Sequence, residues 1–333
     1  MRFRDVKKRY WIAGGLGAAA GFVAVKLLRR PRELVWDEHA AALHHSERSR
    51  FAEVGGVRVH YQEAGSSDAP PVLLLHGFTA SNFVWKETLV PLAERGFRVV
   101  APDLVGFGFS GKPKEGDYTI GAQSQMVLGL MAALGIDRAS LVGSSYGGAV
   151  AATCALDYPE RVERLVLVDA VINDHARNRP LLRLAATRVI GDLVSPLMMG
   201  SRRLLRSQLR KGYAPENRHL FDDERATAHH RPLVAASTQR AALATLRRWR
   251  AARVEEEAHR ITQPTLLVWG ETDPVIPLAH GRQLNRAMPD SRLRIFRRCG
   301  HMPMEERPQE FVEVVAQFLG EGEKEPGALS AKA

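Results

Sequence analysis

Gly143-Ser144-Ser145-Tyr146-Gly147-Gly148 is a glycine-rich turn between an apolar run at residues 139–142 and a segment at 149–158 that we expect to be helical. The pattern Gly-x-Ser-x-Gly between a strand and a helix is typical of a nucleophile elbow, which exposes a serine hydroxyl above a sheet. Side chains two residues before or after that serine would collide with neighbouring backbone, and Gly143 and Gly147 occupy those positions. A flexible Gly-Ser turn would show the same letters, so the interpretation depends on the rest of the chain.

Apolar runs alternate with helical patterns on both sides of this turn, which predicts an α/β fold with a mostly parallel sheet and helices on both faces. We expect strands at residues 57–61, 72–75, 97–101, 139–142, 165–169, 265–269 and 293–296. Ligand sites in such sheets lie beyond the carboxyl ends of the strands. His76, Ser145 and Asp169 all lie at such ends.

The strand pattern stops near residue 171 and resumes after residue 258, which indicates an insertion into the sheet domain. We expect the following organisation: a basic N-terminus with an anchor helix at 1–32, a linker at 33–50, the first part of the core at 51–170, an Arg-rich helical lid at 171–258, the second part of the core at 259–319, and a disordered tail at 320–333. An insertion that begins at the carboxyl end of a strand would cover a site at that edge.

Residues 10–28 form an apolar stretch rich in Gly and Ala, interrupted by Lys26 and flanked by basic residues. A bilayer-spanning helix needs roughly 20 apolar residues. We therefore expect an uncleaved helix that anchors the protein in a membrane, on a side that the flanking charges do not decide. A cleaved signal peptide, which would give a secreted or periplasmic protein, and a helix lying at the lipid surface remain open as well.

The composition is that of a globular protein, with 45% hydrophobic residues and a net charge of +10 over 333 residues. Its two cysteines, Cys154 and Cys299, offer neither a disulfide framework nor the spacing of a metal site. The basic cluster in the expected lid consists of Arg202, Arg203, Arg206, Arg210 and Lys211. It is either a solvated surface or a face toward anionic lipid. No nucleic-acid-binding motif accompanies the charge, so we expect no nucleic-acid partner.

A serine hydroxyl is a weak nucleophile near neutral pH and needs a base that is itself oriented by a carboxylate. Asp273 follows the strand expected at 265–269, and His301 follows the strand expected at 293–296. Both residues therefore belong to the same edge of the sheet as Ser145. Asp169, which ends another strand, is a competing candidate for the orienting carboxylate. The chain order Ser145, Asp273, His301, each after its own strand, is that of one large class of hydrolases.

From about Phe51 to Leu319 the sequence resembles the α/β-hydrolase superfamily. The matching motifs are His76-Gly77-Phe78, the loop 103–110, the elbow, the loop 270–277, Gly300-His301 and Glu306-Arg307-Pro308. The resemblance implies acyl transfer to Ser145, with His301 as base and then acid, followed by hydrolysis, without a metal or an organic cofactor. It also implies that the backbone N–H groups of Phe78 and Tyr146 stabilise the oxyanion, each by roughly 3–4 kcal/mol.

Within the superfamily the organisation resembles membrane-anchored monoacylglycerol lipases and related esterases, which implies a carboxylic ester, derived from lipid, as substrate. The Arg-rich lid and Tyr146 depart from that group, so the acyl chain and head group stay open. Carbon–carbon bond hydrolases also use a serine, but they commonly carry Trp after the catalytic histidine, where this chain has Met302. A cofactor-free haloperoxidase or perhydrolase, or a non-catalytic binding protein of the same fold, would share these motifs too. The oligomeric state is left open.

Overall fold

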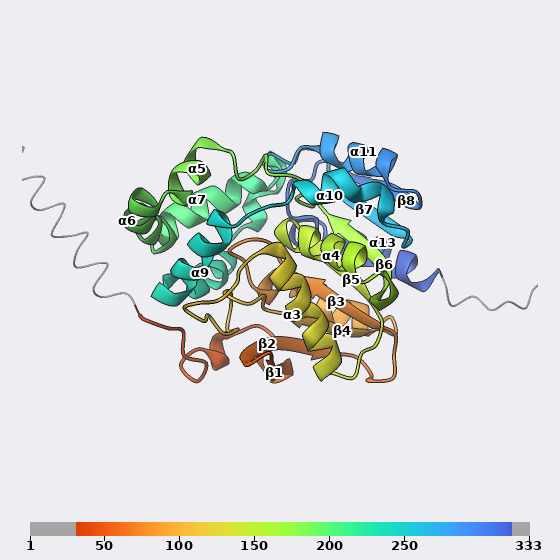
Figure 1. The fold of residues 1–333 in the computed structure, drawn as a ribbon, viewed down its shortest axis with the longest axis horizontal. Helices are drawn as coiled ribbons and strands as arrows, with labels where there is room; N and C mark the ends of the chain where they lie inside the picture. The colour runs from red at the N-terminus through yellow and green to blue at the C-terminus, as the bar shows by residue number, and fades with distance from the viewer. Residues whose placement is uncertain (1–30, 322–333) are drawn as a thin grey trace, which may run out of the picture.

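An eight-stranded sheet forms the centre of the molecule, in a computed structural model that describes residues 31–321 (Figure 1). The strands are β1 Ser49–Val54, β2 Val57–Ala64, β3 Pro71–Leu75, β4 Arg98–Pro102, β5 Ala139–Ser144, β6 Val162–Val168, β7 Thr265–Gly270 and β8 Ser291–Phe296. Their order across the sheet is β1-β2-β4-β3-β5-β6-β7-β8. β2 pairs antiparallel with β1 and β4, and the remaining neighbours pair in parallel. The predicted mostly parallel sheet is confirmed, with β1 as an additional edge strand.

The central strands are apolar throughout because both of their faces are covered. In β3, Leu73 and Leu75 belong to the apolar cluster on one face, whereas Val72 and Leu74 belong to the cluster on the other. The register continues this layering across the sheet, since Leu74 pairs with Val142 of β5.

Helices cover both faces of the sheet (Figure 1). The cluster that contains Leu73 packs under α3 Ile120–Ala133, α4 Tyr146–Asp157 and α11 Leu278–Ala287. The cluster that contains Val72 packs under η3 Asn82–Trp85, α2 Leu89–Ala93, α12 Pro303–Glu306 and α13 Pro308–Gly320. Three further 3-10 turns are η1 Ala40–Ala42, η2 Ser46–Arg48 and η4 Pro159–Arg161. The prediction of helices on both faces is confirmed.

A helical insertion connects β6 to β7, as the interrupted strand pattern predicts. Its elements are α5 Pro180–Ala186, α6 Arg188–Met199, α7 Arg202–Gly212, η5 Pro215–Leu220, α8 Asp223–His230, η6 Arg231–Val234, α9 Ala236–Arg247, α10 Ala252–Glu257 and η7 Ala258–Arg260. In Figure 1, α5, α6, α7 and α9 lie together on one side of the molecule, with α6 at its outer edge. The insertion starts where β6 ends, so it lies at the edge of the sheet where ligand sites are expected.

The expectation of a membrane-anchored protein is wrong for the part of the chain that the structure describes. No helix between residues 31 and 321 is long and apolar enough to cross a membrane. The longest of these helices, α3, has 14 residues, whereas a span needs about 20. The stretch 10–28, on which the expectations of an anchor and of a signal peptide both rested, lies outside the described residues. Neither the anchor nor the localisation is retained.

Candidate active site

Ser145 lies in a strained turn between β5 and α4. Its φ of 54° and ψ of −115° fall outside the regions that residues with a side chain commonly adopt. Two backbone hydrogen bonds hold the turn against the end of β6: Ser145 N–H donates to the Val168 carbonyl, and the Ser145 carbonyl accepts from Val171 N–H, both at 2.9 Å. The turn therefore presents the half-buried Ser145 side chain at the carboxyl edge of the sheet.

The two glycines of the elbow lie where the turn touches neighbouring backbone. A Cβ added to Gly143 would lie 2.4 Å from the Gly147 carbonyl oxygen. A Cβ added to Gly147 would lie 2.3 Å from the carbonyl oxygen of Leu75 and 2.6 Å from that of His76. All three distances are far below van der Waals contact, so the turn needs glycine at these positions, as the sequence predicts.

His301 and Asp273 form a direct hydrogen-bonded pair. His301 Nδ1 lies 2.7 Å from Asp273 Oδ2, and both residues are buried. The other carboxylate oxygen of Asp273 accepts the backbone N–H groups of Val275 at 2.6 Å and Ile276 at 3.1 Å. These two donors fix the carboxylate of Asp273. Because the carboxylate engages Nδ1 of His301, Nε2 remains available for proton transfer.

Ser145 and His301, which both lie within the described residues, are not hydrogen-bonded to each other. The backbone places them on one edge nevertheless, because Ser145 bonds to the end of β6 and His301 follows β8. His301 N–H also donates to the Gly212 carbonyl at 2.8 Å, so the insertion helps to hold the histidine loop. Hydrogen bonds between a nucleophile and its base often tighten only when substrate binds.

Asp169 is the carboxyl group that competes with Asp273 for the role of orienting acid. It is fully buried, and one of its oxygens lies within 4.8 Å of a carboxylate oxygen of Asp273 and of a ring nitrogen of His301. The hydrogen bond of His301 nevertheless goes to Asp273. Among residues 31–321 these three form the one group of His, Cys and carboxylate side chains close enough to hold a metal ion, but the Asp273–His301 hydrogen bond accounts for their closeness.

Two backbone N–H groups beside Ser145 have no acceptor among the described residues, namely those of Phe78 and Tyr146. Tyr146 is the first residue of α4, and N–H groups at a helix N-terminus point away from the helix toward any negative charge. Phe78 follows Gly77, whose backbone lies against Ser145: a Cβ on Gly77 would be 3.2 Å from Ser145 Cβ. The geometry is compatible with the oxyanion-binding role that the sequence predicts for both amides.

An aromatic wall lies beside the turn that carries Ser145. The rings of Phe78, Tyr146 and Trp249 contact one another, with centroids 6.3 Å apart for Phe78–Tyr146, 5.5 Å for Phe78–Trp249 and 4.9 Å for Tyr146–Trp249. Phe107 extends the wall beside Phe78, at 5.9 Å. Trp249 comes from the insertion, so the core and the insertion share one largely buried apolar cluster next to Ser145.

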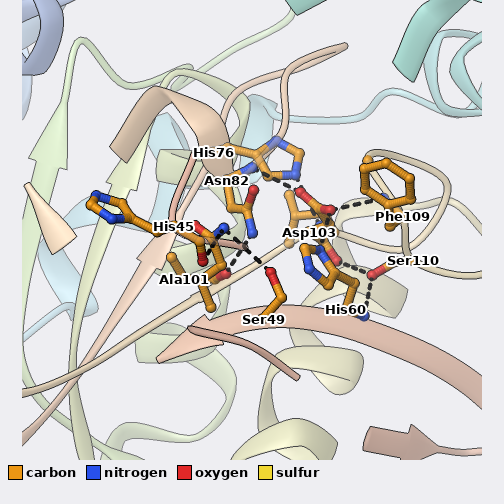
Figure 2. Close-up of polar contacts among 12 residues, drawn as sticks. His45, Ser49, His60, His76, Asn82, Ala101, Asp103, Phe109 and Ser110 are labelled. Carbon is orange, nitrogen blue, oxygen red and sulfur yellow. Dashed lines mark hydrogen bonds and ion pairs between the residues drawn. The ribbon is translucent and has the colours of Figure 1, made fainter. Parts of the chain in front are cut away.

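A buried polar cluster around Asp103 braces the loops next to this site (Figure 2). His60 Nδ1 lies 2.7 Å from Asp103 Oδ2, and the backbone N–H groups of Asn82 and Phe109 donate to the same carboxylate at 2.8 Å. Burial opposes the charge, but the hydrogen bond and the charge of His60 outweigh it and lower the pKa of Asp103 to about 2. Asp103 is thus an ionised anchor that joins β2, the loop after β3 and the loop after β4.

His76 joins the loop that carries Phe78 to the loop that carries Asp103. Its Nδ1 donates to the Gly77 carbonyl at 2.8 Å, and its Nε2 accepts the N–H of Leu104 at 2.9 Å. This pattern requires a neutral ring, and burial lowers the pKa of His76, which favours that form. His76 thereby fixes the backbone immediately before the Phe78 amide.

Two carboxylates just after His301 bind the insertion to the core. Glu306 accepts the N–H groups of Gly300 at 2.9 Å and Ala214 at 3.0 Å. Glu305, which is fully buried, accepts from the Tyr213 hydroxyl and lies 3.1 Å from His229 Nε2. The histidine loop and the segment 212–229 therefore form one polar unit.

Sequence reasoning missed the contributions of Trp249, His60 and Glu305. Each contacts a partner that is far away along the chain, and no spacing or motif marks the pair. For Glu305 the sequence offers only a weak signal, the acidic pair Glu305-Glu306 shortly after His301.

Comparison with known proteins agrees with the fold described above. A profile of proteins with the alpha/beta hydrolase fold matches residues 70–308. A 2-hydroxy-6-oxo-2,4-heptadienoate hydrolase of Pseudomonas putida is 31% identical over 285 residues, which cover 82% of this chain and 97% of that protein.

Among solved structures, a meta-cleavage product hydrolase from Pseudomonas fluorescens is 27% identical with a TM-score of 0.70, covering 83% of this chain and 99% of its own. A bacterial membrane phospholipase A is 30% identical with a TM-score of 0.69, covering 94% of this chain and 98% of its own. The narrower resemblance to monoacylglycerol lipases finds no specific support in these similarities.

Proposed function

Because this chain belongs to the α/β-hydrolase fold family, we propose that it is a serine hydrolase whose nucleophile is Ser145. The observation that carries the proposal is the buried pair of His301 and Asp273, 2.7 Å apart, on the edge of the sheet where the strained elbow presents Ser145. A base, an orienting carboxylate and a nucleophile at one edge are the groups that acyl transfer to serine requires.

In the proposed mechanism, His301 Nε2 accepts the proton of Ser145 as Oγ attacks the carbonyl carbon of the substrate. Asp273 holds Nδ1–H and stabilises the imidazolium that forms. The N–H groups of Phe78 and Tyr146 stabilise the oxyanion. The imidazolium then protonates the leaving group, and a water molecule, deprotonated by His301, hydrolyses the acyl-enzyme.

We infer that the bond cleaved is a carbon–carbon bond next to the oxo carbon of a 2-hydroxy-6-oxo-dienoate. Relatives named for such substrates support this class, both the Pseudomonas putida protein and hydrolases of the 6-phenyl homologue from Burkholderia cepacia and Comamonas testosteroni. The rings of Phe78, Tyr146 and Trp249 make the surroundings of Ser145 apolar, which suits a conjugated hydrocarbon chain better than a charged group. The leaving carbon would take the proton that His301 received from Ser145.

A carboxylic ester with an apolar acyl chain is the second candidate substrate. The membrane phospholipase A supports it, because that similarity extends over 94% of this chain, against 83% for the meta-cleavage product hydrolase. Met302 supports it as well, since it replaces the Trp that commonly follows the catalytic histidine of carbon–carbon bond hydrolases.

We further infer that residues 171–258 act as a lid. Gly212 bonds to the backbone of His301, and Trp249 contacts Phe78 and Tyr146, so the insertion covers the edge on which the triad lies.

The test compares kcat/KM for 6-methyl and 6-phenyl 2-hydroxy-6-oxo-dienoates with kcat/KM for p-nitrophenyl esters of graded chain length. We expect the dienoates to be turned over more efficiently, and Ser145→Ala to lose at least about 10⁴-fold on every substrate. Higher efficiency on long-chain esters would replace the first candidate by the second. Full activity of a correctly folded Ser145→Ala variant would refute the serine mechanism itself.

A further inference from the structure

Asp169 is a second carboxyl group beside the proposed catalytic pair, and the mechanism above gives it no role. It directly follows β6, has a positive φ of 43° and is fully buried. Its Oδ1 accepts the N–H of Gly270 at 2.9 Å, whereas its buried Oδ2 accepts no hydrogen bond from any residue in the described range. An ionised carboxylate with a bare, buried oxygen is unfavourable, because nothing replaces the lost hydration.

The number of donors decides which of the two carboxyl groups carries the charge. Asp273 accepts from His301 and from two backbone N–H groups, while Asp169 accepts from one. Two buried carboxyl groups this close do not ionise together. The charge therefore belongs to Asp273 and the proton to Oδ2 of Asp169. In agreement, burial and the neighbouring Asp273 raise the pKa of Asp169 well above its usual range.

Among residues 31–321, no cation other than a protonated His301 faces Asp169. The titratable groups that face it are Asp273 after β7, His301 and Cys299 after β8, and Glu306 in α12. A neutral Asp169 leaves one negative charge to balance one imidazolium. A second carboxylate would hold the proton on His301 too firmly for its transfer to the leaving group.

We propose that Asp169 is a protonated positioning residue that supports Asp273 and can replace it. In the intact enzyme its neutral carboxyl faces the Asp273 carboxylate. When Asp273 is removed, Asp169 releases its proton to water, and the resulting carboxylate, already within 4.8 Å of the His301 ring, orients the histidine. The proposal rests on the serine mechanism proposed above, but not on the identity of the substrate.

The test measures the rate at which a fluorophosphonate labels Ser145, which depends on His301 but not on the natural substrate. Loss of an unsupported triad carboxylate costs about 10⁴-fold. We expect Asp273→Ala to lose only about 10²-fold, Asp169→Asn less than about tenfold, and the double variant about 10⁴-fold, close to His301→Ala. Asp290→Asn, at an exposed position before β8, serves as the neutral control.

The pH profile and the infrared spectrum separate positioning from a merely structural role. In Asp273→Ala, labelling should depend on a further ionisation, that of Asp169, which the double variant lacks. The wild type should show the C=O stretch of a buried protonated carboxyl that shifts in D₂O and is absent in Asp169→Asn.

The proposal is overturned if Asp273→Ala is as slow as His301→Ala, if the double variant is no slower than Asp273→Ala, or if that C=O band does not depend on Asp169. Undiminished labelling of His301→Ala would instead refute the underlying serine mechanism.

Discussion

Gly147, in the first turn of α4, lies where this helix closely approaches the end of β3. A Cβ there would be 2.3 Å from the Leu75 carbonyl oxygen, and this neighbour is backbone that cannot move without shifting the strand. We expect Gly147→Ala to lower the free energy of unfolding by roughly 3 kcal/mol or more, or to prevent folding. Urea-induced unfolding followed by circular dichroism measures the change.

Gly121 in α3 is the matched control, since nothing lies within 4 Å of a Cβ placed there. Gly121→Ala should leave the free energy of unfolding unchanged or raise it by up to about 1 kcal/mol, because alanine favours a helix more than glycine does. Equal effects of the two substitutions would contradict the steric account of Gly147.

Single residues of the site were predictable where their role is local. The spacing of Gly143, Ser145 and Gly147 requires only a sharp turn after a strand, which the sequence shows directly. The sequence predicts less clearly whether Asp273 or Asp169 orients His301, because both residues follow strands that end on one edge of the sheet. The hydrogen bond from His301 decides it, and that bond depends on how three loops meet.

At the scale of elements, Glu305 joins α12 to the insertion through a buried charged contact. Its carboxylate lies 3.1 Å from His229 Nε2 and 3.6 Å from an Arg225 nitrogen, and the charges of His229 and Arg225 hold the pKa of Glu305 below its usual range despite burial. We expect Glu305→Gln to lower the free energy of unfolding by roughly 3 kcal/mol, because it leaves Arg225 without its buried partner. Thermal and urea unfolding measure the loss.

Glu310→Gln provides the comparison for Glu305→Gln, because Glu310 contacts Arg294 and Arg307 at the surface. Its substitution should change the free energy of unfolding by less than about 1 kcal/mol. A loss at Glu305 that is no larger than the loss at Glu310 would show that the buried contact does not hold the insertion.

The insertion contains two kinds of helix, which should differ in local stability. α6 exposes Val189, Ile190, Leu193 and Val194, whereas α9 buries Ala242, Leu243 and Leu246. Helices with few buried contacts open at lower free energy. We expect amides of α6 to exchange with solvent at least about tenfold faster than those of α9 in native-state hydrogen exchange. If the amides of α6 and α9 were equally protected from exchange, α6 would have to pack against a further surface.

At the scale of the whole molecule, acid stability should depend on the buried Asp103. Its pKa is about 2 in the folded protein and about 3.9 in an unfolded chain. A lowered pKa stabilises the fold above the unfolded value, and this contribution disappears as the pH falls through the folded value. We expect Asp103 to contribute roughly 2 to 3 kcal/mol at pH 7, lost between about pH 4 and pH 2.

The measurement for Asp103 is the free energy of unfolding of the wild type and of Asp103→Asn from pH 7 to pH 2. The difference between the two proteins should be constant above about pH 5 and shrink toward pH 2. A difference that does not change with pH would show that Asp103 acts by packing alone.

The sequence by itself determined the order of the strands from β2 to β8, though not the edge strand β1, as well as the place of the insertion and the edge on which Ser145, Asp273 and His301 lie. These features follow from local periodicity and from the rule that parallel strands end on one side of a sheet. The sequence did not establish a membrane anchor. The apolar composition of residues 10–28 suggested one, but that stretch lies outside the described residues.

Only the tertiary structure decided that His301 is hydrogen-bonded to Asp273 and that Asp169 lies buried beside them. It also decided that Trp249 completes the aromatic wall and that Glu305 joins α12 to α8. Each of these depends on distances of a few ångströms between segments far apart in the chain, and no local pattern encodes such distances.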